Sequence, residues 1–175
     1  MGIGRRAVVL AAALSILAAG PAAASAKTFS SGNRHLAIKD RQATVSTIKV
    51  KTAGIIKDVN VMVRLDHAYD PDLDLYLVSP AGRVVQLSTN NGASGGSADY
   101  GTGNDDCTGT PTIFDDETTT SIFDGTPPFA GPFKPEQPLS TLDRSQRKGT
   151  WRLIVGDNAT GNQGTLYCWK LKIAV

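Results

Sequence analysis

Six acidic side chains in two short segments are the residues of this chain best suited to binding a ligand. They are Asp70, Asp72, Asp74, Asp115, Asp116 and Glu117. Calcium takes six to eight oxygen ligands, which carboxylates and loop carbonyls supply. Because residues two apart on an extended strand point to the same side, the first three carboxylates are expected to share one face. The sequence therefore predicts a calcium site, with the second segment as another arm and the run Asn104, Asp105 and Asp106 as a third.

The acids are concentrated in the middle third of the chain. Residues 66–124 contain eleven acids and one base, a formal charge of −10, whereas the whole chain carries +2. Such crowding is repulsive unless a cation lies among the carboxylates. The pattern is not that of an EF-hand, because Leu75 and Ala81 stand where that loop has its glycine and its last glutamate. A solvated acidic surface is the alternative to a calcium site.

Catalysis by the chain itself is not expected. A serine–histidine–aspartate triad needs a histidine, and only His35 and His67 are available. A zinc site is not expected either, because the chain has only two histidines, and its two cysteines are expected to be crosslinked. Without Arg5 and Arg6, 16 of the 18 bases remain against 16 acids, so the sequence predicts no basic surface for nucleic acid.

The first 26 residues have the organisation of a secretory signal peptide. Arg5 and Arg6 precede an apolar run over residues 7–19, and the small residues 24–26 follow it. The run has thirteen residues, and about 20 are needed to cross a bilayer, so no transmembrane segment is expected. We predict cleavage after Ala26 and secretion. The arginine pair has a twin-arginine signal as its alternative interpretation.

The two cysteines lie in the part of the chain that is predicted to be exported. Disulfides form in that setting, so we predict that Cys107 pairs with Cys168. The bond would close a loop of 61 residues and tie an acidic loop to the last strand. Two unpaired thiols are the alternative.

Apolar and polar residues alternate with a period of two along most of the chain, and helical periodicity does not recur. The clearest runs are 44–51, 59–65, 73–78, 83–88, 151–155 and 167–173. Trp151 and Trp169 each begin an apolar set, which favours core packing over a sugar-binding surface. Residues 27–43 have no clear periodicity and are interpreted as a polar lead-in. Residues 125–138 contain five prolines and are interpreted as an ordered crossover. The sequence predicts an all-β domain over 44–175.

Three groups of segments carry a family pattern. They are Asp72-Leu73-Asp74 with Ser79-Pro80-Ala81-Gly82, Phe114-Asp115-Asp116-Glu117 with Phe129 to Ser140, and Gly149-Thr150-Trp151 with Gly164-Thr165-Leu166-Tyr167-Cys168-Trp169. Over residues 44–175 the chain resembles the P domain, or Homo B domain, of the kexin and furin-like proprotein convertases and of bacterial subtilisin-type proteases. The resemblance implies a jelly-roll-like β-sandwich of about eight strands. In that family the domain normally follows a subtilisin-like catalytic domain that it helps to fold.

These observations lead to one expected function and one alternative. We expect a secreted, non-catalytic protein of the P-domain type, stabilised by a disulfide and Ca²⁺. It would dock onto a protein partner such as a subtilisin-like protease, and serine endopeptidase activity would attach to it only by association. The alternative is a module that binds carbohydrate or another cell-surface ligand through the acidic edge and exposed Tyr76 and Tyr100.

Overall fold

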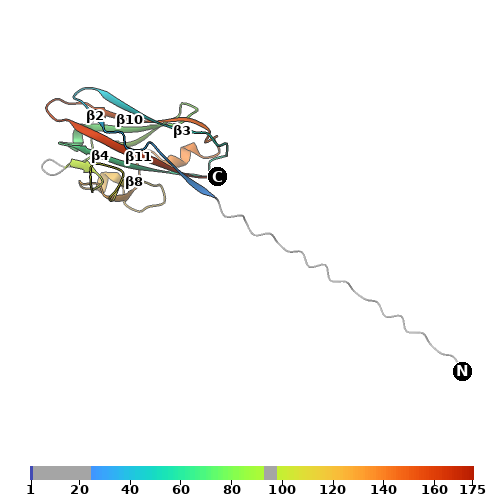
Figure 1. Ribbon diagram of the computed structural model, residues 1–175. Helices are drawn as coiled ribbons and strands as arrows, with labels where there is room; N and C mark the ends of the chain where they lie inside the picture. The colour runs from blue at the N-terminus through green and yellow to red at the C-terminus, as the bar shows by residue number, and fades with distance from the viewer. Residues whose placement is uncertain (2–24, 93–97) are drawn as a thin grey trace.

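The computed structural model describes Met1, residues 25–92 and residues 98–175, so nearly all of the predicted signal peptide lies outside the described residues. Within the described ranges, two β-sheets pack face to face (Figure 1). The only helices found there are three short 3₁₀ turns, η1 (Asp70–Asp72), η2 (Ile122–Asp124) and η3 (Leu139–Leu142). None of them is long and apolar enough to cross a membrane. The all-β prediction is confirmed.

The first sheet has the order β1-β11-β4-β8-β9, with β2 paired to β11 and β7 paired to β4. Its strands are β1 (Ala26–Ser30), β2 (Leu36–Ile38), β4 (Asp58–His67), β7 (Ala98–Tyr100), β8 (Thr112–Phe114), β9 (Gly131–Phe133) and β11 (Gly164–Ala174). All pairs are antiparallel except β8 with β9. The proline-rich crossover thus contributes only β9, an edge strand, where a proline costs no interior hydrogen bond.

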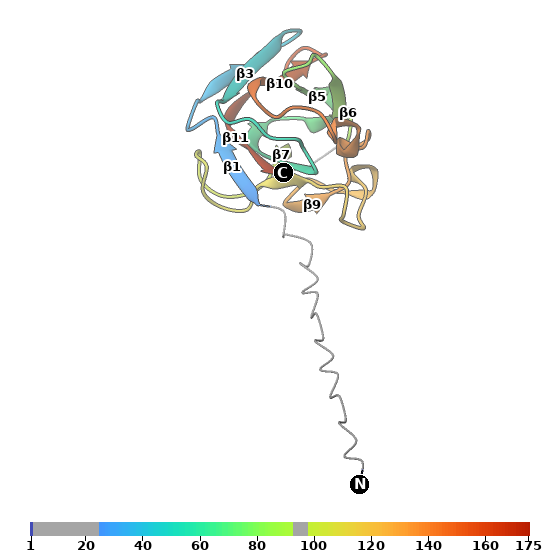
Figure 2. The ribbon, with the colours of Figure 1, turned by 90° about the vertical axis from the view of Figure 1, so that its right-hand side faces the viewer.

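The second sheet has the order β3-β10-β5-β6 and is antiparallel throughout. Its strands are β3 (Ala43–Val50), β5 (Leu73–Val78), β6 (Val84–Thr89) and β10 (Gly149–Asp157). In Figure 2 this sheet forms one layer, and the sheet containing β1 and β11 forms the other. Four of the eleven described strands have only three residues, which is too short for alternation to be recognised in the sequence.

The core lies between the two layers and contains both tryptophans. Neither Trp151 nor Trp169 has exposed surface. The indole N–H of Trp169, on β11, donates to the hydroxyl of Ser46, on β3, at 3.0 Å. The indole N–H of Trp151 donates to the carbonyl of Arg147 at 2.9 Å. Each ring therefore fills the core while its single polar atom is satisfied.

Residues 27–43 are part of the sandwich rather than a lead-in. Strand β1 pairs with β11 from Ala26 opposite Ala174 to Ser30 opposite Lys170, and β2 pairs with the other end of β11. Most side chains of β1 are exposed, so this strand is held by its backbone hydrogen bonds. The sequence shows no alternation there because β1 presents little apolar surface to the core.

Candidate functional site

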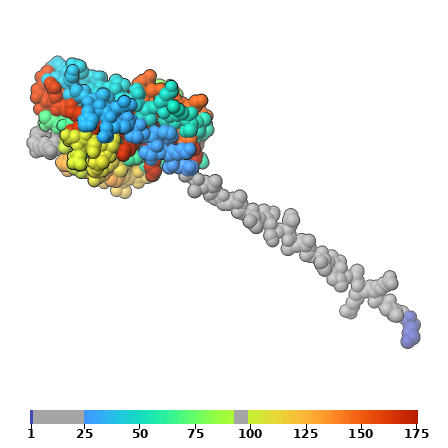
Figure 3. All heavy atoms as spheres, in the orientation of Figure 1, coloured from blue at the N-terminus to red at the C-terminus, as the bar shows by residue number. Residues whose placement is uncertain are grey.

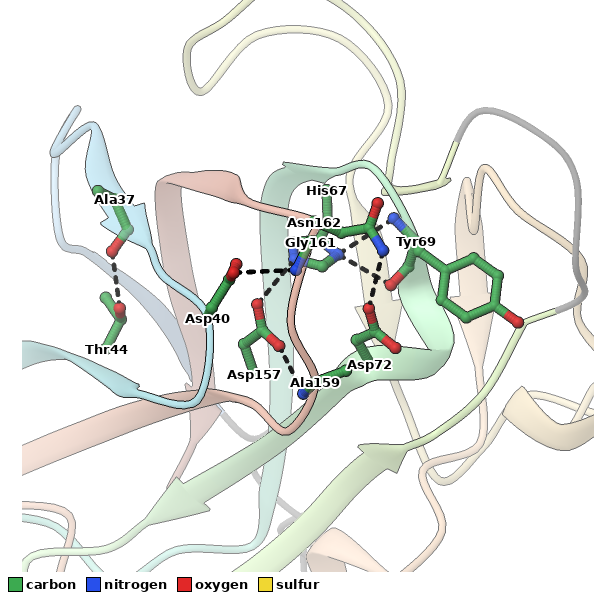
Figure 4. Close-up of polar contacts among 10 residues, drawn as sticks. All are labelled: Ala37, Asp40, Thr44, His67, Tyr69, Asp72, Asp157, Ala159, Gly161 and Asn162. Atoms are coloured by element: carbon green, nitrogen blue, oxygen red, sulfur yellow. Dashed lines mark hydrogen bonds and ion pairs between the residues drawn. The ribbon is translucent and has the colours of Figure 1, made fainter.

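Two loops meet at one end of the sandwich, and we call this region the loop end. They are the turn over residues 68–72, between β4 and β5, and the hairpin over 158–163, between β10 and β11. The carboxylate of Asp72 accepts from the side-chain amide of Asn162 at 3.2 Å (Figure 4). The amide of Asn158 donates to Asp74 at 2.7 Å. The two asparagines hold the hairpin against the turn.

The turn is a 3₁₀ helix and not an extended strand. Pro71 lies in its first turn, where its fixed φ is favourable and its missing N–H costs nothing. Asp70 and Asp72 belong to η1, whereas Asp74 lies in β5. The expectation that the three carboxylates share one strand face is therefore wrong, because the alternation argument holds only for extended backbone.

Asp70 is a buried carboxylate without hydrogen-bond partners in the described part of the chain. It has no exposed surface, and neither of its oxygens has a hydrogen-bond partner among the described residues. Burial, and to a smaller extent the nearby charge of Asp99, raise the pKa of Asp70 to about 8. Gly92 lies against it so closely that an added Cβ would be 3.1 Å from the Cβ of Asp70. A buried carboxyl without a partner is costly when charged, so the site favours either a proton or a cation.

His67 and Asp157 form a buried hydrogen-bonded pair beside the turn. The imidazole Nε2 lies 3.3 Å from a carboxylate oxygen of Asp157, and neither side chain has exposed surface. The other ring nitrogen, Nδ1, lies 2.8 Å from the carbonyl of Tyr69 (Figure 4). Asp157 also accepts from the N–H of Ala159 at 3.0 Å. The pair therefore joins the end of β4 to the end of β10, which is a structural use of the histidine.

The second acidic segment is occupied with hydrogen bonds of its own. Asp115 accepts from the side chain of Asn60 at 3.0 Å and from the N–H of Glu117 at 2.9 Å. Asp116 accepts from the N–H groups of Leu139 and Ser140, at 3.0 and 2.8 Å, at the start of η3. These two carboxylates are satisfied without a cation.

Carboxyl groups also crowd around Asp115. The pKa of Glu117 is raised to about 7, chiefly by a hydrogen bond with Asp115 and then by burial. The pKa of Asp58 is raised by burial and by the charges of Asp115 and Asp143. Protonation relieves this crowding in the metal-free chain.

The three acidic arms do not converge on one site. Asp115 lies beside Asn60, near the start of β4, whereas η1 follows the end of that strand. Because a strand rises about 3.3 Å per residue, Asp115 and η1 are roughly 20 Å apart. Asp106 binds the N–H and hydroxyl of Thr108 in a separate hairpin. In the ranges that the structure describes, no group of three or more side chains is placed to hold a metal ion. A single three-armed calcium site is therefore not formed.

The family model for the proprotein convertase P-domain matches residues 56–173, which is more than half of the chain. The chain belongs to this family. Two solved structures share the P-domain fold. One is a serine protease of Aeromonas sobria, at 22% identity and a TM-score of 0.51, and the other is that protease in complex with the chaperone ORF2, at 21% and 0.51. Each match covers 86% of this chain but 26% of the other chain. Comparison with curated proteins gives no match.

The disulfide of this P-domain forms as predicted. Cys107 and Cys168 are bonded, with their Cα atoms 5.7 Å apart. The bond attaches a hairpin over residues 101–111 to β11. Within the hairpin, Gly103 and Gly109 face each other so closely that a Cβ on Gly103 would lie 2.8 Å from the Cα of Gly109. The hairpin needs glycine at both positions.

The environment that the sequence predicts for Tyr100 is wrong, and the sequence did not identify Asp99 or Arg64. Tyr100, expected to be an exposed aromatic, has no exposed surface, and its hydroxyl bonds with that of Ser88 at 2.7 Å. Asp99 lies opposite Asp66 in the β4–β7 pair, and its charge raises the pKa of Asp70. Arg64 is buried beneath the disulfide hairpin. Both positions depend on pairing between distant segments, for which neither segment has a local signal.

Proposed function

We propose that this protein is a secreted, non-catalytic P-domain that binds a subtilisin-like serine protease and supports its folding or stability. The observation that carries the proposal is the family match over residues 56–173. It is supported by the fold shared with a serine protease of Aeromonas sobria, whose solved structures include a complex with a chaperone. The chain spans about a quarter of those chains, which is the size of an accessory region.

The surroundings of His67 support a non-catalytic role. A general base in a triad must reach the hydroxyl of a serine. Both ring nitrogens of His67 instead have partners, the carbonyl of Tyr69 and the carboxylate of Asp157. Purified protein should not hydrolyse casein. Hydrolysis that disappears in His67→Ala, with that variant still folded, would contradict the non-catalytic role.

We further propose that Ca²⁺ stabilises the loop end through Asp70. Asp70 provides two buried oxygens without partners, and Asp99 is near enough for its charge to act on Asp70. Oxygen donors of this kind suit a hard cation, and loop carbonyls and water would complete the coordination. Bound Ca²⁺ would supply the positive charge that allows Asp70 to ionise.

Thermal melting in chelator and across a calcium series tests this site. A ligand that binds only the folded state adds about 2.7 kcal/mol at a hundredfold excess over its dissociation constant. We expect the melting temperature to rise with Ca²⁺ in the wild type and in Asp116→Asn, but not in Asp70→Asn. An equal rise in all three proteins would place the cation elsewhere, and no rise in any would contradict calcium binding and leave Asp70 as a buried, protonated carboxyl.

Affinity capture tests the protease partner. The purified protein is immobilised and exposed to the culture supernatant of its source, and captured proteins are labelled with a fluorophosphonate, which reacts with active serine hydrolases. We expect a labelled subtilisin-like protease that is absent from a column carrying heat-denatured protein. Retention on polysaccharide resins without any labelled protein would instead favour the carbohydrate-binding alternative.

A further inference from the structure

A hollow on the outer face of the first sheet is lined by two basic side chains. It lies between β4, β11 and the disulfide hairpin over residues 101–111, and it encloses about 300 Å³ including its open mouth. Arg64 and Lys170 line it, together with the disulfide-bonded Cys107 and Cys168. In Figure 3 the hairpin (yellow) lies beside the blue N-terminal segment of the domain. The N–H of Cys107 donates to the side chain of Asn33, in the loop between β1 and β2, at 3.2 Å.

Strand register places the two bases side by side. Arg64 on β4 lies opposite Cys168 on β11, and Lys170 is two residues further along β11. Such diagonal neighbours are typically 7–8 Å apart and share one face of the sheet. Because Val63 and Leu65 point into the core, Arg64 points outward. It is nevertheless only 4% exposed, since the hairpin covers it.

The guanidinium of Arg64 has more donors than the described residues satisfy. An arginine side chain has five N–H donors. In Arg64, Nη2 donates to the carbonyl of Asn104 at 3.0 Å. Nε and Nη1 are buried and have no acceptor among residues 25–92 and 98–175. Lys170 reaches the carbonyl of Cys107 at 3.5 Å, the limit of a hydrogen bond. A buried cation with free donors is costly unless an anion joins it.

The nearby acids do not fill this role. Within the described ranges, no arginine or lysine side chain lies within ion-pair distance of an acid. Asp106 is exposed and is bound to Thr108. The charge of Arg64 acts on Asp99 and Asp106 without direct contact, because neither forms an ion pair with it.

We propose that this hollow binds a carboxylate group. The N–H groups on Nε and Nη1 of Arg64 are free to donate to carboxylate oxygens, and Lys170 adds a second positive charge. Met62 and Pro111 line the remaining wall and suit a short aliphatic carrier. The enclosed part of the hollow is about 70 Å³, well below the volume of typical small-ligand pockets, so it fits a small group such as a carboxylate rather than a whole ligand. The proposal goes beyond protease binding and calcium, since it uses none of the residues of the loop end.

Titration with acetate, followed by NMR on the Arg64 Nε–H resonance of the isotope-labelled protein, tests the proposal. Acetamide is the neutral probe of the same shape, and sodium chloride keeps the ionic strength constant. We expect a saturable shift of the Arg64 resonance with acetate and none with acetamide or chloride. Equal shifts with acetate and acetamide, or a shift that never saturates, would overturn it.

Matched variants show whether the bases carry the binding. Arg64→Met should weaken acetate binding about tenfold or more, and Lys170→Gln several-fold. Lys172→Gln is the control, because Lys172 is exposed on the same strand and does not line the hollow. Binding that is unchanged in Lys170→Gln, or weakened equally in Lys172→Gln, would also overturn the proposal. Lys170→Gln decides the test if Arg64→Met does not fold.

Two peptides distinguish the source of the carboxylate. N-acetyl-Gly-Ala carries a free terminal carboxylate, and its C-terminal amide does not. If the peptide acid binds more tightly than acetate and its amide does not bind, the natural ligand is a peptide C-terminus. Binding of acetate that the peptide cannot match indicates a small free acid. Equal binding of the peptide and its amide would contradict carboxylate recognition.

Discussion

A buried carboxyl without partners makes stability depend on pH in a definite direction. The folded pKa of Asp70 is about 8 and its ordinary value is 3.8. Between these values the folded chain holds a proton that the unfolded chain has released, so stability falls as pH rises from about 4 to about 8. The slope for one group is at most about 1.4 kcal/mol per pH unit.

We therefore predict that metal-free protein is less stable at pH 8 than at pH 5, and that Asp70→Asn reduces this difference. Urea unfolding in chelator at both pH values measures it. The exposed Asp124 provides the matched control, because Asp124→Asn should leave the pH dependence unchanged. The same pH dependence in wild type and Asp70→Asn would mean that Asp70 does not hold the proton.

One of the hydrogen bonds that join the two sheets through the core involves a tryptophan. The indole N–H of Trp169 on β11 donates to Ser46 on β3. Ser46→Ala would leave that buried donor unsatisfied and lower the free energy of unfolding by about 1–3 kcal/mol. Thr47→Ala, at the exposed neighbouring position, should change it by less than about 0.5 kcal/mol. Denaturant unfolding of both variants measures the difference, and equal effects would show that the bond contributes no net stability.

At the scale of elements, Asp116 positions the turn η3 that packs beside β4. Its two carboxylate oxygens accept from Leu139 and Ser140. By analogy with helix caps, Asp116→Ala should cost about 1 kcal/mol, and Asp116→Asn, which keeps one oxygen acceptor, should cost less. Thermal unfolding of the two variants gives the order. Equal melting temperatures for wild type and Asp116→Ala would contradict a capping role.

The same elements show what a sequence can predict here. Strands β4, β5, β10 and β11 follow from alternation, because in each strand apolar side chains on one face point into the core and mostly polar side chains lie on the other face. Strand β1 does not, because its stability comes from backbone pairing with β11. Nor does η1, where the Asp70-Pro71-Asp72 run has the alternation of a strand but the backbone of a 3₁₀ turn.

The sequence could predict which acidic residues belong to the candidate site but not where they lie in the fold. Asp70 and Asp74 are acidic residues of a strongly acidic region, which the sequence shows directly. These residues are far from Asp115 because the two acidic segments lie at opposite ends of β4. This placement depends on the order of the strands in the sheet. Asp99 and Arg64 acquire their environments only through pairing of β4 with β7 and through the disulfide hairpin.

At the scale of the whole molecule, the disulfide links the acidic middle of the chain to its last strand. Cys107 and Cys168 are 61 residues apart. Closing a loop of that length removes conformational freedom from the unfolded chain, an effect of about 4 kcal/mol in the chain-entropy model. The bond therefore acts mainly on the unfolded state, while in the folded state it holds the hairpin over Arg64.

The double variant Cys107→Ser with Cys168→Ser should lose about 2–4 kcal/mol of stability. Its unfolded chain is less compact, so the dependence of the free energy on urea concentration should become steeper as the midpoint falls. Urea unfolding of the wild type and the double variant under non-reducing conditions measures both quantities. A lower midpoint with an unchanged slope would place the effect in the folded hairpin. In that case acetate binding at Arg64 should weaken together with stability, because the same hairpin forms the cover of the hollow.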